Sequence, residues 1–293
     1  MSSYERQQND KTFSIGDGMK TICVPHHYSA ELQDDNETLL LYSPENDDIW
    51  IRISVVTVEN EDKTETSMFD YVINLAKEQG KEFVIVDDKT YTLEVRQSEE
   101  NGDQIVTYHF EIGYKSHIIF ISVTTFLQTS ATERFQSVLT EMPEYISSIK
   151  EISEEQHNRF SLTSNDYRLI RKRSSGILDI SEDELSDFHE SDKTPKTIQR
   201  ILNEKKYRES NTTELQSLGI AFGDYIQHKY PNFQWSIVHD QFGRDFCLNY
   251  EKTAIDIFPQ TMISKRVEYG EEFDVEELLS GIIHTVGHLT ENQ

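Results

Sequence analysis

The sequence has few basic residues and no long apolar run. Lysine and arginine together number 28 in a chain of 293 residues, against 53 aspartates and glutamates, so the formal net charge is -25. A surface of this charge repels nucleic-acid phosphates and anionic lipids, and it attracts basic proteins. We therefore expect no nucleic-acid partner. Acidic residues also keep a protein soluble, which is the simpler explanation of the charge.

Cysteine is too scarce for a disulfide framework. Cys23 and Cys247 are the only two, and they lie too far apart in sequence for a metal knuckle. No apolar run is long enough to cross a bilayer, and residues 1–11 are polar rather than signal-like. We predict a cytoplasmic protein that does not insert into a membrane.

Motifs that carry chemistry are also missing. The sequence has no phosphate-binding loop, no G-x-S-x-G elbow, no G-x-G-x-x-G and no cysteine-protease signature. His284 and His288 lie four residues apart, but Thr285 stands where a zinc-peptidase helix carries glutamate. We predict no catalytic residue, no cofactor and no metal. A hydrolase built from distant residues stays an open alternative.

The residues that are present predict a folded chain with two domains. Hydrophobic residues make up 36% of the sequence, with 15 phenylalanines and 14 tyrosines, which is enough to build a core. Apolar side chains alternate from Ile49 to Val58, from Val106 to Tyr114 and from Ile118 to Phe126. Alternation of this kind is typical of strands with one buried face. The last two segments are separated by a turn and predict a hairpin.

Two helices are predicted among these strands. Apolar residues recur at helical spacing from Met68 to Ala76, and Gly80 follows as a stop. A second helix is predicted from Phe135, with an interruption at Pro143. Residues 1–152 are thus predicted to form an α+β domain in which helices cover an antiparallel sheet. Residues 153–195 lose the periodicity and are rich in Ser, Glu and Asp, so we interpret them as an acidic, polar linker.

Residues 196–293 are predicted to form a smaller α+β domain. Asn211 and Glu214 resemble a capping box before a helix, on which Gly219 and Gly223 would let another backbone approach closely. Three strands follow, over Trp235–Asp240, Asp245–Tyr250 and Ala254–Phe258, and a helix that begins near Asp274 ends the chain. The prediction is a three-stranded meander between helices.

Four residues of this second domain are candidates for partner binding. Lys265 and Arg266 form a basic pair in an acidic protein and can contact a carboxylate, or else make local ion pairs with neighbouring glutamates. Trp235 is a candidate aromatic anchor, with a place in the core as the commoner alternative. Asp240, on the same predicted strand, completes the set.

Several segments resemble known families. LGIAFGDYI from Leu218, WSIVHDQFG from Trp235 and ISKRVEYGE from Ile263 resemble the bacterial family catalogued as domain of unknown function 3806, which implies no activity. The first half, from FSIGDGMKTICVP at Phe13 to YISSIKE at Tyr145, resembles the DcrB/PsbP-like α/β/α sandwich. That resemblance implies binding rather than catalysis, because its members include effector-associated chaperones of type VI secretion.

These features favour a non-enzymatic cytosolic binding protein. Our leading hypothesis is an immunity protein or effector-associated adaptor of a bacterial toxin system that recognises a basic protein partner by electrostatic steering. The alternatives are a small-ligand binding protein built on the sandwich domain, with its site between sheet and helix, and an uncharacterised hydrolase.

Overall fold

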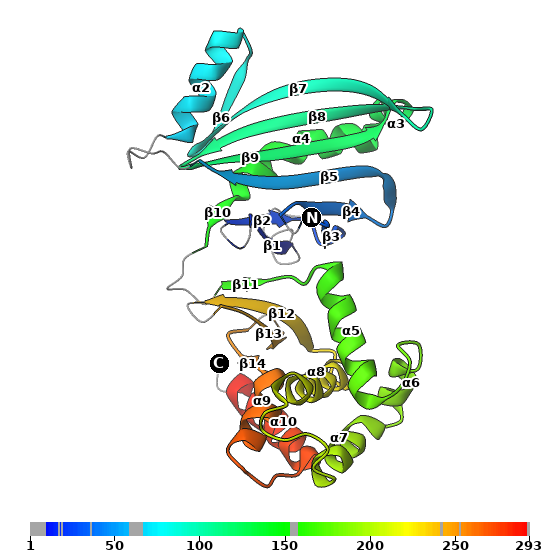
Figure 1. Ribbon diagram of the computed structural model, residues 1–293. Coiled ribbons are helices and arrows are strands. Elements are labelled where there is room, and N and C mark those ends of the chain that lie inside the picture. Colours follow the sequence, from blue (N-terminus) through cyan, green and yellow to red (C-terminus); the bar gives the residue numbers. More distant parts are fainter. Residues whose placement is uncertain are drawn as a thin grey trace. The chain divides into compact units, whose positions relative to one another are not determined.

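The computed structural model describes residues 10–16, 18, 20–35, 37–58, 67–152, 158–240, 243–251 and 253–291 (Figure 1). The chain divides into two compact units, Met1–Ser164 and Asn165–Gln293, and each is described by itself. Helices and antiparallel sheets occur in both units, so the predicted α+β class is confirmed.

A seven-stranded antiparallel sheet forms the centre of the first unit. Its strands lie in the order β3-β4-β5-β9-β8-β7-β6. Their bounds are β3 (Ser29–Leu32), β4 (Leu39–Ser43), β5 (Asn46–Thr57), β6 (Phe83–Val86), β7 (Lys89–Glu100), β8 (Asp103–Tyr114) and β9 (His117–Phe126). The three alternating segments of the sequence correspond to β5, β8 and β9, and the predicted hairpin is confirmed by the pairing of β8 with β9.

One face of this sheet is buried under a helix and a small second sheet. The register places Ile51 opposite Val123 and Ile53 opposite Ile121, and all four side chains are buried. The cover consists of α4 (Glu133–Ser148), preceded by α3 (Leu127–Ser130), and a sheet of β1 (Lys11–Ile15), β2 (Lys20–Val24) and β10 (Lys150–Glu151). The predicted interruption at Pro143 is wrong, because α4 continues through this residue to Ser148.

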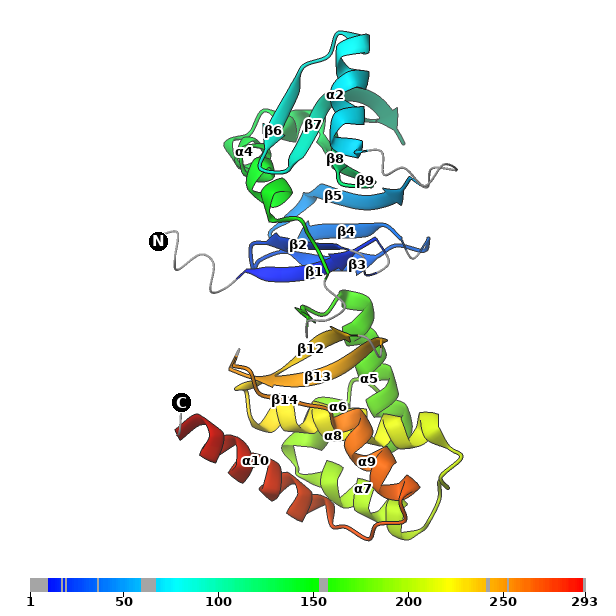
Figure 2. The ribbon, with the colours of Figure 1, turned by 90° about the vertical axis from the view of Figure 1, so that its left-hand side faces the viewer.

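The other face of the sheet carries α2 (Met68–Gln79). Ser67 caps this helix by accepting a hydrogen bond from the Asp70 amide, and Gly80 ends it in the left-handed conformation, as predicted. A Cβ added to Gly113 of β8 would lie 2.1 Å from the carbonyl oxygen of Met68, so only glycine permits this contact. Figure 2 shows α2 and α4 on either side of β6. The last strand of the unit is β11 (Asn158–Phe160).

The second unit is built around one long helix. Its elements are α5 (Ser164–Leu178), α6 (Leu185–Glu190), α7 (Lys193–Asn203), α8 (Thr212–Lys229), β12 (Phe233–Asp240), β13 (Gly243–Tyr250), β14 (Asp256–Ile257), α9 (Pro259–Glu268) and α10 (Val275–Glu291). Leu218, Phe222 and Ile226 of α8 are fully buried, and α8 packs against α6, α7, α9 and β12. The strands β12, β13 and β14 pair in antiparallel order, as predicted for the meander.

The segment interpreted as a linker is largely helical. It contains α5, α6 and the beginning of α7, and the boundary between the two compact units lies at residues 164 and 165. The apolar pattern was hard to see because α5 buries polar side chains as well as apolar ones. Ser174 and Ser175 are buried, and Asp166 is buried in an ion pair with Arg244, 2.6 Å from its guanidinium.

One local prediction in the second unit is wrong, and one helix was not predicted. Asn211 precedes α8 but makes no side-chain cap, because its amide oxygen accepts a hydrogen bond from the Arg208 backbone instead. The segment after Phe258, for which no element was predicted, is the helix α9, with Pro259 in its first turn, where a missing N–H costs nothing. By contrast, Asp274 does cap α10, accepting from the amides of Glu276 and Glu277.

The prediction for Gly219 is confirmed, since α9 packs closely on α8. A Cβ added at Gly219 would lie 2.3 Å from the carbonyl oxygen of Pro259 and 2.6 Å from the Cα of Gln260. Both are backbone atoms, so a methyl group can be accommodated only if α9 moves. Gly223 similarly makes room for the Trp235 ring: a Cβ added at Gly223 would lie 2.6 Å from atoms of that ring.

We expect Gly219→Ala to lower the free energy of unfolding by about 2 kcal/mol, the usual cost of overpacking a close contact. The matched control is Gly281→Ala in α10, where the described structure places no atom within 4 Å of an added Cβ. That change should raise the free energy of unfolding by up to about 1 kcal/mol, because alanine favours a helix. Urea unfolding followed by tryptophan fluorescence measures both values, and equal effects would contradict the proposed close approach.

Candidate functional site

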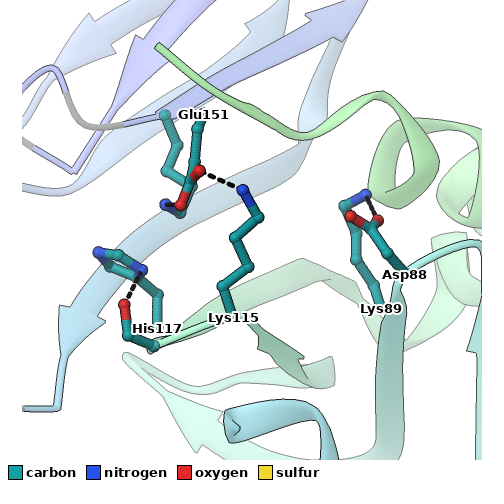
Figure 3. Close-up of polar contacts among 7 residues, drawn as sticks. Asp88, Lys89, Lys115, His117 and Glu151 are labelled. Atoms are coloured by element: carbon teal, nitrogen blue, oxygen red, sulfur yellow. Dashed lines mark hydrogen bonds and ion pairs between the residues drawn. The ribbon is translucent and has the colours of Figure 1, made fainter. Parts of the chain in front are cut away.

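Three lysines of the first unit gather around one tyrosine ring. The ammonium nitrogens of Lys20, Lys89 and Lys115 lie 5.2, 4.5 and 5.6 Å from the ring centroid of Tyr114. We call these four residues the lysine cluster, and Figure 3 shows part of it. Ammonium groups at this distance are attracted to an aromatic ring. Such a concentration of positive charge is unexpected in a chain with a net charge of -25.

Strand ends bring these residues together. Lys20 is the first residue of β2, and Lys89 is the first residue of β7. Tyr114 is the last residue of β8, and Lys115 follows it in the turn before β9 with a positive φ of 50°. The register of β10 on β2 places Glu151 opposite Lys20. The cluster thus lies where strands from both sheets of the unit begin or end.

Two carboxylates contact the lysine cluster. Lys115 donates to Glu151 Oε2 (Figure 3), and Lys20 donates to Glu151 Oε1 at 3.2 Å, so one carboxylate bridges two ammonium groups. Lys89 donates to Asp88 Oδ1 at 2.6 Å. Two of the three lysines are buried: Lys20 and Lys89 are 1% and 3% exposed, whereas Lys115 is 51% and Glu151 40% exposed.

The surroundings shift several titrations. Burial lowers the pKa of Lys20, although its hydrogen bond to Glu151 opposes that shift. The pKa of Lys115 is raised by its hydrogen bond to Glu151. Burial favours the neutral acid of Glu151, but hydrogen bonds from Lys115 and Lys20 outweigh it and hold the pKa of Glu151 below its ordinary value. The pKa of His117 is lowered by burial and by the charge of Lys20.

This arrangement is suited to holding a negatively charged group. Ammonium groups are strong donors to carboxylate and phosphate oxygens. Lys20 and Lys89 are held at strand ends, and Lys115 lies in the short turn between β8 and β9. Sequence analysis missed the site because its lysines are far apart in the chain and form no local motif. Only the pairing of β2 with β10 and of β7 with β8 brings them together.

A second surface of the first unit is apolar and exposed. Val84 of β6 and Leu93 of β7 are each 46% exposed, and Val95 of β7 is 49% exposed. Val84 lies opposite Tyr91 in the register, and Leu93 and Val95 follow Tyr91 at intervals of two, so the side chains share one face of the sheet. We call these three residues the apolar strip. The strip lies on β7 and on β6, which is the terminal strand in the sheet order.

The four predicted partner-binding residues are placed differently from one another. Trp235 is 5% exposed and packs against Phe246, and its buried indole N–H has no partner in the described part of the chain. Arg266 donates to the Met262 carbonyl at 2.8 Å and lies 3.9 Å from a Glu271 oxygen. Lys265 is exposed in the last turn of α9. Asp240 ends β12, and its side chain lies outside the described part of the structure.

Another polar group in the second unit resembles a hydrolytic triad but is closed. The buried His189 ring lies 2.7 Å from Thr194 Oγ1 through Nδ1 and 3.2 Å from Asp224 Oδ2 through Nε2. Thr194 is fully buried, so a substrate has no access to its hydroxyl. We assign these residues to holding α6 and α7 against α8. The two predicted helical histidines, His284 and His288, lie edge to face on the exposed side of α10 with their ring centroids 4.5 Å apart.

The described residues contain neither a metal-binding group nor a membrane-spanning helix. No group of three or more His, Cys, Asp or Glu side chains within the described ranges is arranged to hold a metal ion. None of the helices among those residues has the length and apolar character needed to cross a membrane.

We expect Glu151 to make stability depend on pH in the acid range. Because its pKa is lower in the folded chain, its contribution is present above its unfolded pKa and is lost as pH falls through the folded value. For a partly exposed ion pair this contribution is at most about 1 kcal/mol. The free energy of unfolding, measured with urea between neutral and acidic pH, should depend less steeply on pH in Glu151→Gln than in the control Glu144→Gln. Glu144 is an exposed position of α4. Identical slopes would show that the bridge does not stabilise the fold.

Comparison with known proteins gives a family match within the second unit and a structural match over most of the chain. Residues 195–278 match the family described as Domain of unknown function (DUF3806), as the sequence motifs indicated. No curated protein matches the chain. A crystal structure from Bacteroides thetaiotaomicron VPI-5482 superposes with a TM-score of 0.71 at 16% identity, covering 94% of this chain and 99% of that one. The solution structure of cyanobacterial PsbP (CyanoP) from Synechocystis sp. PCC 6803 has a TM-score of 0.25 at 10% identity, over 50% of this chain and 94% of that one. The chain therefore shares its fold with the Bacteroides protein, and residues 195–278 of its second unit match the DUF3806 family model.

Proposed function

We propose that this chain is a non-enzymatic binding protein that docks a basic protein segment on the apolar strip. The observation that carries the proposal is the exposure of three large apolar side chains, Val84, Leu93 and Val95, side by side at the edge of a sheet. Single exposed apolar residues are ordinary, but a contiguous group often marks a docking surface. A terminal strand also offers backbone groups with which a partner strand can pair.

The charge around the strip supports a basic partner. Glu82 is exposed just before β6, and the tip of the β7–β8 hairpin carries Glu99, Glu100 and Asp103, all exposed. Glu94, by contrast, is paired with both Lys81 and Arg96, and these three groups together carry one positive charge. Carboxylates at the rim of an apolar surface attract a basic partner and orient it before contact.

The immunity-protein or adaptor role in a toxin system is one specific form of this function. An acidic protein that masks a basic effector would use the same two features, an apolar contact at its centre and a charged rim. A second candidate function, the binding of a small anionic ligand in the cytoplasm, is favoured by the buried ammonium groups of Lys20 and Lys89.

The experiment is an affinity capture from host lysate with matched variants. We expect the wild-type chain to retain a basic protein that increasing salt releases, because rim charges are screened by ions. Leu93→Ser and Val95→Ser should each weaken retention by about tenfold, the loss typical of a central apolar contact. Leu169→Ser, at an exposed apolar position of α5, is the control and should retain the partner.

Two results would contradict the proposal. Equal retention by Leu93→Ser and the wild type would show that the apolar strip is not the docking surface. Retention that does not change with salt would show that the acidic rim does not attract the partner.

A further inference from the structure

We propose that the lysine cluster is a binding site for the phosphate group of a small ligand, and that Glu151 occupies this site as an internal substitute in the free protein. The inference rests on the second candidate function, the binding of a small anion, and is independent of the protein-docking role, because the residues that carry it are not those of the apolar strip. It rests on the burial of the lysines, on the bridging position of Glu151 and on the local charge.

The burial of the lysines is the first argument. Lys20 and Lys89 are 1% and 3% exposed, although lysine is almost never fully buried unless it is paired. An ammonium group that has lost water needs an anion close by, since leaving it uncompensated is costly. Both ammonium nitrogens lie beside the Tyr114 ring, at 5.2 Å for Lys20 and 4.5 Å for Lys89 from its centroid.

The position of Glu151 is the second argument. Its two oxygens each accept from a different lysine, so a single anion already bridges Lys20 and Lys115. A phosphate group presents more oxygens in a compact tetrahedron and can make the same bridge. Glu151 belongs to a strand of two residues and is 40% exposed, so its side chain can turn outward without disturbing the buried core.

The charge balance is the third argument and selects phosphate over carboxylate. With Glu151 in place, three ammonium groups face two carboxylates, Glu151 and Asp88. If Glu151 leaves, the remaining charge is three positive against one negative. A phosphate monoester carries about -1.5 to -2 at neutral pH and balances this excess, whereas a single carboxylate does not.

The test measures phosphate binding by isothermal titration and by amide shifts in NMR spectra, at about pH 8, where phosphate is mainly a dianion. We expect inorganic phosphate to bind Glu151→Gln about fivefold more tightly than the wild type, because one partly exposed ion pair no longer competes. Lys115→Gln should weaken binding by a similar factor. Lys115 is half exposed, so this variant is expected to fold. Lys172→Gln, at an exposed position of α5, makes the same change of charge and should bind like the wild type.

Four outcomes overturn the proposal. The first is that folded Glu151→Gln, checked by circular dichroism, binds no phosphate at millimolar concentration. The second is that Lys115→Gln and Lys172→Gln change the affinity equally, which would indicate only a general effect of charge. The third is that acetate binds Glu151→Gln as tightly as phosphate, which would show a carboxylate site instead. A phosphate monoester such as glycerol phosphate distinguishes the source: tighter binding than inorganic phosphate supports a phosphorylated ligand, and exclusion of the ester overturns it.

Discussion

The alternating apolar side chains of β5, β8 and β9 must be buried on one face of the central sheet, and the rest of the first unit is arranged around this requirement. Ile53, Ile121 and Ile112 belong to neighbouring strands and are all but inaccessible to solvent. A sheet with one such face needs a cover, which α4 and the small sheet of β1, β2 and β10 provide. The two candidate surfaces of the unit follow from the limits of this cover.

At β6 and β7 the cover is incomplete. Tyr91 is still buried, but Leu93 and Val95, further along the same strand and on the same face, are about half exposed. Apolar side chains continue to alternate along β7 beyond the part of the strand that α4 covers, and these side chains are therefore exposed to solvent. Where the small sheet meets the large one, strand ends instead bring Lys20 and Lys89 under cover beside Tyr114. One surface is thus apolar and uncovered, and the other is charged and buried.

Sequence analysis predicted the elements whose periodicity is strong. The strands around Ile51, Tyr108 and Ile121 and the helix that ends at Gly80 were recognised because each repeats one kind of side chain at one spacing. The close approach at Gly219 was recognised because a glycine inside a helix has a cost that packing can explain. Helix α5 was not predicted because its buried face includes the polar residues Ser174, Ser175 and Asp166, which interrupt the apolar periodicity of a helix.

The candidate site was less predictable than the fold, for a different reason. Its geometry depends on the register of β10 on β2, which joins Lys20 and Glu151 from opposite ends of the first unit. Register is determined by the whole core, and no local pattern around either residue encodes it. The residues that drew attention in the sequence, Trp235 and Arg266, are instead engaged by their own neighbours.

Electrostatics connects the overall composition with the lysine cluster. In a chain with nearly twice as many acidic as basic residues, most lysines can remain at the surface and find a carboxylate there. Placing Lys20 and Lys89 inside forgoes their hydration and makes the fold depend on the anions beside them, Glu151 and Asp88. For stability alone, apolar residues of similar size would serve these positions as well or better. A role in holding a negative charge is the consequence that apolar residues cannot reproduce. The exposed, bridging carboxylate of Glu151 shows the geometry in which such a charge is held.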